Sequence, residues 1–272
     1  MKNLRIRTLF MICCAAILLS VIYIWGSVLP KELYDVNFNM RDAAPSWNHI
    51  FGCDWMGRDM FYRTLNGMTI SIRIGLFASV ISCIIAIIFG IGAATLGEKV
   101  DQFILWLIDL FQGMPHMIFL IFISILLGKG VRGILIGVAL IHWPRLARVV
   151  RAEIFSIKKR PYILISEKLG KGKMYIATHH IFRHIIPQFI IELILLFPHA
   201  ILHESAITFL GFGVPPDRPA IGVILSESMR YLTQGSWWLS VFPGLMLLSI
   251  VLLFDTIGNN LSKLIQAKSA QL

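Results

Sequence analysis

Six apolar stretches, each about 20 residues long, are the feature that most constrains this chain. They cover approximately residues 9–29, 70–96, 103–128, 134–150, 186–211 and 237–257. A hydrocarbon core of about 30 Å needs roughly 20 helical residues to cross it. Because backbone amides cannot stay unpaired in lipid, each stretch is expected to be a helix. The sequence therefore predicts an all-α polytopic membrane protein with about six transmembrane helices.

Composition supports this class and weakens several others. The chain is 57% hydrophobic and its mean hydropathy is +0.75, whereas soluble domains are about 45–50% apolar. The four cysteines form no C-x-x-C pair, so neither a disulfide framework nor a zinc ribbon is indicated. No internal repeat is visible, which disfavours secondary transporters built from inverted repeats.

The N-terminal stretch follows three basic residues, Lys2, Arg5 and Arg7. A cleaved signal peptide is one interpretation, but the run is long for one and no small-x-small cleavage site follows it. We favour an uncleaved signal anchor. Residues 30–68 are polar and are expected to form an ordered extracytoplasmic loop.

The net charge of +10 is concentrated in one segment, from Arg145 to Arg183, which holds ten Lys or Arg residues and only two acids. In a soluble protein this charge would point to nucleic acid. In a membrane protein it marks a cytoplasmic loop, so we expect no nucleic acid partner. With an even number of spans, both termini are then expected in the cytoplasm.

The middle of this basic segment has apolar residues at 162, 165, 169 and 176, close to one helical face. One interpretation is an amphipathic helix that lies on anionic lipid. The other is a docking helix for a soluble partner.

The same segment resembles the ATPase-coupling loop of binding-protein-dependent importers, which carries Glu-Ala-Ala, three further residues, a glycine and a later proline. Gly170 matches the glycine and Pro187 matches the proline, but residues 164–166 depart from Glu-Ala-Ala. The positions that the resemblance assigns to ATPase coupling are Leu164, Ile165, Ser166, Gly170, Lys171 and Gly172.

A second stretch, residues 49–63, resembles the Leu-Gly-Thr-Asp-x-x-Gly-Arg-Asp motif of dipeptide, oligopeptide and nickel permeases, with Cys53 in place of the threonine. The matching residues are Gly52, Asp54, Gly57, Arg58 and Asp59. The glycines permit tight turns, and Arg58 is expected to form a local ion pair that fixes the loop. The resemblance places this loop near the docking site of a binding protein, and a purely structural role is the alternative.

Residues 205–213 and 254–261 resemble two further motifs of that family, in the same order along the chain. The resemblance implies the C-type permease subunit of an ATP-driven importer in the bacterial cytoplasmic membrane, with a coupling helix between helices four and five. It implies a signal anchor and outer loop over 1–68, a permease domain over 69–262 and a cytoplasmic tail over 263–272. It also implies no catalysis and no bound cofactor in this chain, since ATP and Mg²⁺ bind partner subunits. The implied partners are a B-type permease, two ATPases, a substrate-binding protein and membrane lipid.

The fifth stretch contains His199 and His203 at i and i+4, followed by Glu204. Such groups in a spanning helix are costly and normally face the bundle interior or a water path. Because imidazole suits nickel, copper and zinc, the pair is a candidate transient metal contact. Hydrogen bonding to a neighbouring helix is the alternative. His116 is added to this candidate path.

Nickel is favoured as cargo over peptide, because the nickel branch resembles this chain in two features. One is the His-x-x-x-His before the Ser-Phe-Leu-Gly motif, and the other is a long spacing from Gly170 through His180 to Pro187. Whether the nickel would travel free or chelated stays open.

Other polar residues in the stretches are Asp109, Gln112, His142, Glu192 and Asp255. They either pack between subunits or line a path. His142, beside Trp143, is expected at the membrane interface with the tryptophan as an anchor.

Two other classes of membrane protein fit the sequence less well. An intramembrane metalloprotease would need His-Glu-x-x-His, whereas this chain has His-x-x-x-His-Glu. A secondary transporter would have no use for a coupling loop.

Overall fold

The computed structural model describes residues 2–269 of the chain, and within that range it contains helices and loops but no β-strand. The longer elements are α1 (Lys2–Val28), α2 (Met60–Thr95), α3 (Glu98–Gln112), α4 (His116–Leu126), α5 (Gly130–Lys158), α8 (Phe182–Phe209) and α10 (Trp238–Ser269). The shorter ones are α6 (Pro161–Lys168), α7 (Lys173–Ile176), α9 (Ile221–Ser228), η1 (Lys31–Tyr34), η2 (Phe38–Met40), η3 (Ala177–Ile181) and η4 (Met229–Gln234).

Five helices are individually long and apolar enough to cross a membrane, and α3 with α4 makes a sixth crossing if the bent pair counts as one. The two are bent by 93° at the break between them. That break is where Gly113 and Pro115 interrupt the apolar run, and Pro115 stands at the N-cap of α4. The all-α polytopic prediction is confirmed.

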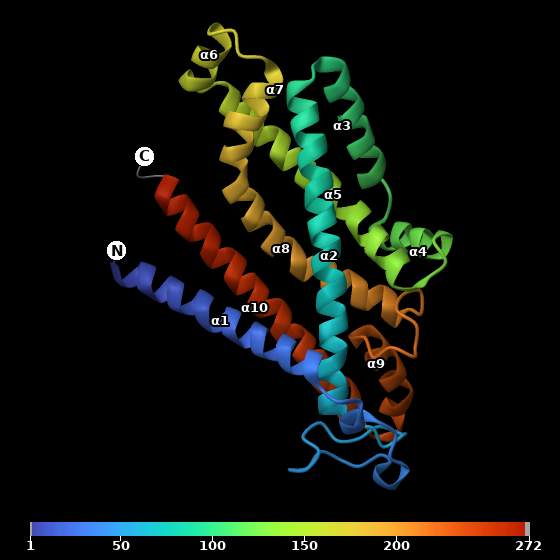
Figure 1. Ribbon diagram of the computed structural model, residues 1–272. Helices are drawn as coiled ribbons and strands as arrows, with labels where there is room; N and C mark the ends of the chain where they lie inside the picture. The colour runs from blue at the N-terminus through green and yellow to red at the C-terminus, as the bar shows by residue number, and fades with distance from the viewer. Residues whose placement is uncertain (1, 270–272) are drawn as a thin grey trace.

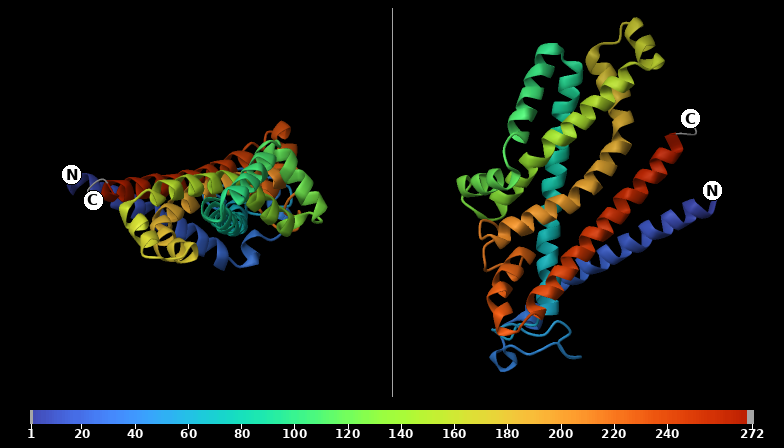
Figure 2. Two further views of the ribbon diagram at one scale, coloured as in Figure 1. Left: turned by 90° about the horizontal axis from the view of Figure 1, so that it is seen from above. Right: turned by 180° about the vertical axis from the view of Figure 1, so that it is seen from behind.

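The helices gather at one end and spread toward the other (Figures 1 and 2). The gathered end carries the loop over residues 29–59, whereas α6 and α7 lie at the opposite end. Both described ends of the chain, those of α1 and α10, point away from the 29–59 loop (Figure 1). Helix α2 forms the spine, since it packs along α5, α8 and α1.

Small residues allow α2 and α5 to approach closely. A Cβ added at Gly90 would lie 2.6 Å from the Val150 side chain and 3.0 Å from the carbonyl of Ala147. Ala78 and Ala86 on α2 are fully or almost fully buried. Such close backbone contact is the usual way for spanning helices to pack without a hydrophobic driving force between them.

Helix α2 extends beyond the predicted apolar stretch. Its 36 residues span about 54 Å at 1.5 Å per residue, well over a core of about 30 Å. The surplus lies at the gathered end, where the loop covers polar residues of the first turns. The boundary predicted at residue 69 therefore falls inside α2.

The predicted cytoplasmic tail, residues 263–272, continues α10 as far as Ser269. Residues 270–272 of that prediction lie outside the described part of the chain.

Candidate translocation path, coupling segment and outer motif

Four histidines line one cavity of about 560 Å³. His116 comes from the start of α4, His142 from α5, and His199 and His203 from α8. The ring centroids of His142 and His203 are 5.2 Å apart, and those of His142 and His199 are 6.5 Å apart. The structure thus brings together three predicted path residues and a fourth imidazole.

Other polar side chains complete the cavity wall, namely Gln112, Arg145, Glu192 and Asp255. Glu192 accepts a hydrogen bond from Gln188 at 3.0 Å and Asp255 accepts one from Asn259 at 2.8 Å, each within its own helix. Groups that are costly in lipid therefore face one shared polar space.

Asp109 is not among the residues that line this cavity. Its carboxylate accepts a hydrogen bond from Arg148 at 2.5 Å, which joins α3 to α5 within the chain.

The interfacial placement predicted for His142 and Trp143 is wrong. Trp143 is 2% exposed and packs against Phe89 and Phe111 in the core. Helix α5 runs on to Lys158, well past the apolar run that ended near residue 150, so His142 lies near mid-helix. Its buried Nε2 has no hydrogen-bond partner among the described residues. Buried polar atoms in proteins are usually hydrogen-bonded.

Glu204 lies apart from the histidine cavity, on another face of α8. It is fully buried and its carboxylate accepts hydrogen bonds from Thr208 at 2.9 Å and from Ser205 at 3.3 Å. Glu204 faces away from the cavity because a residue next to His203 is rotated about 100° around the helix. Its carboxylate is instead held by these contacts within α8.

No group of three or more His, Cys, Asp or Glu side chains among the described residues is close enough to hold a metal ion. The imidazoles are nevertheless the ligand type that late transition metals prefer. The cavity is therefore a polar space in which the described residues form no closed coordination site.

The coupling segment folds as α6 and α7, joined by a turn at Gly170, whose φ is +76°. Ile163 is fully buried and Ser166 is 8% exposed, so this face of α6 packs on the bundle. The opposite side carries exposed apolar side chains, namely Tyr162, Leu164, Ile165 and Leu169. Three of the four residues predicted to share an apolar face thus point outward, whereas Ile176 is buried on α7.

The coupling segment is held to the bundle by polar contacts. Ser166 contacts His180 at 3.3 Å between Oγ and Nε2, which holds α6 against the π-helical turn η3. Lys171 lies over the Tyr175 ring at 4.8 Å, and Gly172 follows it into α7. Single π-helical turns such as η3 are rare in proteins, and those that occur are often found at functional sites.

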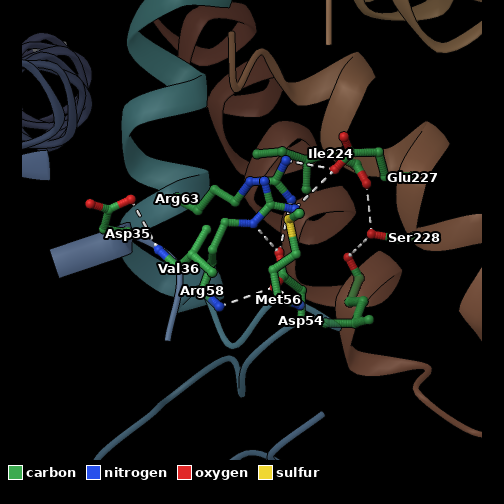
Figure 3. Close-up of polar contacts among 10 residues, drawn as sticks. Asp35, Val36, Asp54, Met56, Arg58, Arg63, Ile224, Glu227 and Ser228 are labelled. Atoms are coloured by element: carbon green, nitrogen blue, oxygen red, sulfur yellow. Dashed lines mark hydrogen bonds and ion pairs between the residues drawn. The ribbon is translucent and has the colours of Figure 1, made fainter. Parts of the chain in front are cut away.

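The outer motif is tied to α9 by four charged side chains, Asp54, Arg58, Arg63 and Glu227, which we call the outer network (Figure 3). Arg63 donates to Asp54 at 3.2 Å and to Glu227 at 2.6 Å. Arg58 donates to Asp54 at 2.7 Å and approaches Glu227 at 3.5 Å. The predicted local ion pair of Arg58 is therefore present, with Asp54 as its close partner.

Asp59 has a separate task. It N-caps α2, since its carboxylate accepts from the amides of Phe61 at 2.8 Å and Tyr62 at 3.3 Å. The same carboxylate contacts His49 Nδ1 at 2.7 Å.

Burial, helped by the nearby carboxylates of Asp59 and Asp54, raises the pKa of the Cys53 thiol to about 11.

Both motif glycines adopt positive φ, +69° at Gly52 and +73° at Gly57. A Cβ at Gly57 would collide with the carbonyl oxygen of Asn37. Only glycine satisfies both the backbone conformation and this close approach.

Comparison with known proteins decides the family. The family described as binding-protein-dependent transport system inner membrane component matches residues 86–267. The chain belongs to this family. A peptide permease protein of Brucella ovis is 35% identical over 240 residues, which cover 86% of this chain and 78% of the relative. The dipeptide transport system permease protein DppC of Bacillus subtilis is 28% identical over 239 residues, covering 88% and 75%.

As a binding-protein-dependent permease, the chain is a multi-pass inner-membrane component and not an enzyme. Membership implies that it works with ATPase and binding-protein subunits.

Arg63 and Glu227 were not singled out from the sequence, and His142 was expected at the membrane interface. A charged residue within the first turns of a spanning helix was a usable signal for Arg63. Nothing local identifies Glu227 as its partner, because 164 positions separate them.

Replacing Asp59 by alanine removes the N-cap of α2 and leaves His49 unpaired. We expect the permease to lose about 1 kcal/mol or slightly more of stability. Asp59→Asn is the matched control, because asparagine caps helices about as well as aspartate. Thermal unfolding of the purified proteins measures both, and an Asp59→Ala protein as stable as the wild type would contradict the assignment.

Proposed function

We propose that this permease forms half of the translocation path of an ATP-driven importer for di- or oligopeptides. The observation that carries the proposal is kinship, because relatives up to 35% identical are named as peptide or dipeptide permeases. A cavity of about 560 Å³ is also within the range that small organic ligands occupy.

Nickel, free or chelated, is the second candidate, and one observation favours it. Four imidazoles line the cavity, which is more than binding of an ordinary peptide requires. An ion that must leave again is better served by separated, exchangeable contacts than by a closed site. A metal held by a small peptide-like chelator would satisfy both lines of support.

The remaining subunits and the orientation follow from the same proposal. A B-type permease would complete the path, and two ATPases would take the exposed side of α6. The basic segment and both termini would face the cytoplasm, and the 29–59 loop would meet the binding protein. ATP turnover would then shift the path between outward-facing and inward-facing states.

The cargo is tested by deletion and complementation of the gene. We expect the deletion strain to lose growth on di- or tripeptides as sole source of a required amino acid, and the wild-type gene to restore it. Unchanged peptide uptake together with lost accumulation of labelled nickel would overturn the peptide proposal and leave the metal.

The histidine cavity gives a sharper test of the metal candidate. His199→Ala combined with His203→Ala should abolish nickel accumulation while the complex still assembles, if these imidazoles carry metal. His184→Ala is the control, because His184 faces Glu153 at 3.7 Å near the coupling segment, away from the cavity. Normal nickel uptake by the double variant would remove the metal role.

A further inference from the structure

The outer network connects segments of the chain that lie beyond the motif over residues 49–63. Arg63 is 2% exposed and Asp54 is fully buried, and one guanidinium spans carboxylates from two separate connections of the chain. Asp54 belongs to the loop between α1 and α2. Glu227 belongs to α9, which lies between α8 and α10. The network therefore joins both of these outer connections to the first turn of α2 (Figure 3).

Neighbouring contacts extend this unit. Ser228 Oγ donates to the carbonyl of Leu239 at 2.8 Å, which ties the end of α9 to the start of α10. The amide of Asn37 donates to the carbonyl of Met56 at 3.1 Å, which closes the loop on itself. We call residues 29–59, the first turn of α2, α9 and η4 together the outer cap.

The opposite end of the chain is arranged differently. There α1 and α10 diverge from α2, whereas α10 stays beside α8 (Figures 1 and 2). The bundle is thus held together at the outer cap and is spread at the end that carries α6.

Burial of such charges is a poor way to gain stability, since desolvation offsets most of the attraction. What a guanidinium bridging two carboxylates does provide is a defined geometry, because its planar fork fixes the direction of each bond. This geometry is what a rigid connection between separate segments needs.

We propose that Arg63 and Glu227 are positioning residues that lock the outer cap of this chain into one rigid body, so that the cap moves as a unit and the segments of this chain move relative to one another at the end carrying α6. This inference rests on the family membership of the chain and is independent of the cargo. Because α8 leaves the cap and passes the histidine cavity, a cap that moves as a unit leaves the inner ends of the helices as the parts that rearrange within this chain.

Distances between spin labels in the reconstituted importer test this. One label pair reports on the cap, with Trp47→Cys, whose side chain is fully exposed, and Arg230→Cys on η4. The other pair reports on the inner end, with Lys99→Cys and Lys263→Cys. Both sets carry Cys13→Ser and Cys14→Ser, whereas Cys53 and Cys83 are buried and stay in place.

The importer is measured without nucleotide and trapped with ATP and vanadate. We expect one narrow cap distance that is the same in both states, and an inner distance that changes. A cap distance that shifts as much as the inner one would overturn the proposal. This comparison is made with all four residues of the outer network unchanged.

Glu227→Gln then removes one charge of the network at nearly constant shape. We expect a broadened cap distance and a fall of about fivefold in the ratio of stimulated to unstimulated ATP hydrolysis, the low end of typical coupling. Asp42→Asn is the control, because Asp42 also lies in the outer cap but belongs to an exposed ion pair. Glu227→Gln with a narrow cap distance and full stimulation would overturn the positioning role. A wrong cargo assignment leaves the spin-label distances unchanged, so the two failures are distinguishable.

Discussion

Replacing Arg63, which ties the 29–59 loop to α2 through Asp54, by methionine is expected to destabilise the permease strongly. Methionine fills a similar volume but leaves Glu227 and Asp54 without their shared partner. Breaking a buried ion pair by removing one member costs about 3–5 kcal/mol, and we expect the lower value because Arg58 still pairs with Asp54. The midpoint of thermal unfolding of the purified permease should fall by about 5–10 °C.

The control is Arg41→Met in the same loop. Arg41 pairs with Asp42 at 3.3 Å, but the two side chains are 62% and 44% exposed. Exposed pairs contribute less than about 1 kcal/mol. If both variants unfolded at the wild-type temperature, the network would have no structural importance.

Gly170→Glu is expected to abolish transport by disturbing the turn between α6 and α7. The φ of Gly170 is +76°, a conformation that costs a residue with a Cβ about 1–2 kcal/mol. The turn would relax toward an ordinary conformation and move the exposed side of α6. We expect the variant to lose most of its co-purified ATPase and at least about tenfold in uptake, on the scale of typical coupling energies.

Two related variants separate the backbone strain at Gly170 from the effect of the added charge. Gly170→Ala introduces the backbone strain without a new charge, so it should show a smaller loss in the same direction. Gly172→Ala should behave as wild type, since a Cβ there meets nothing within 4 Å and the backbone φ is not positive. Full ATPase recruitment and full uptake by Gly170→Glu would refute the coupling role of this turn.

The spans were predictable because membrane crossing leaves a strong local signal. An apolar run of about 20 residues has few alternatives in lipid, and the break between α3 and α4 falls at Gly113 and Pro115, which interrupt the third apolar run. The position of the coupling segment was predictable, but the packing of its apolar side chains was not. Its apolar residues were expected on one face, but Gly170 ends α6 early and Ile176 packs elsewhere.

The parts that escaped prediction depend on contacts between distant segments. His142 was assigned to the membrane interface because the apolar run ended near residue 150, whereas α5 continues to Lys158. Glu204 was grouped with His203 by adjacency, although successive helical residues face different neighbours. The pairing of Arg63 with Glu227 is set by how α9 returns to α2, which no local pattern encodes.

Cysteine labelling in intact cells tests the central claim most directly, namely that α6 and the turn after it face the ATPases inside the cell. Lys171→Cys and Trp47→Cys are compared in a background with Cys13→Ser and Cys14→Ser, using a thiol reagent that does not cross membranes. We expect Trp47→Cys to be labelled in intact cells and Lys171→Cys to be labelled only after the membrane is opened. Labelling of Lys171→Cys from outside, with Trp47→Cys protected, would contradict it.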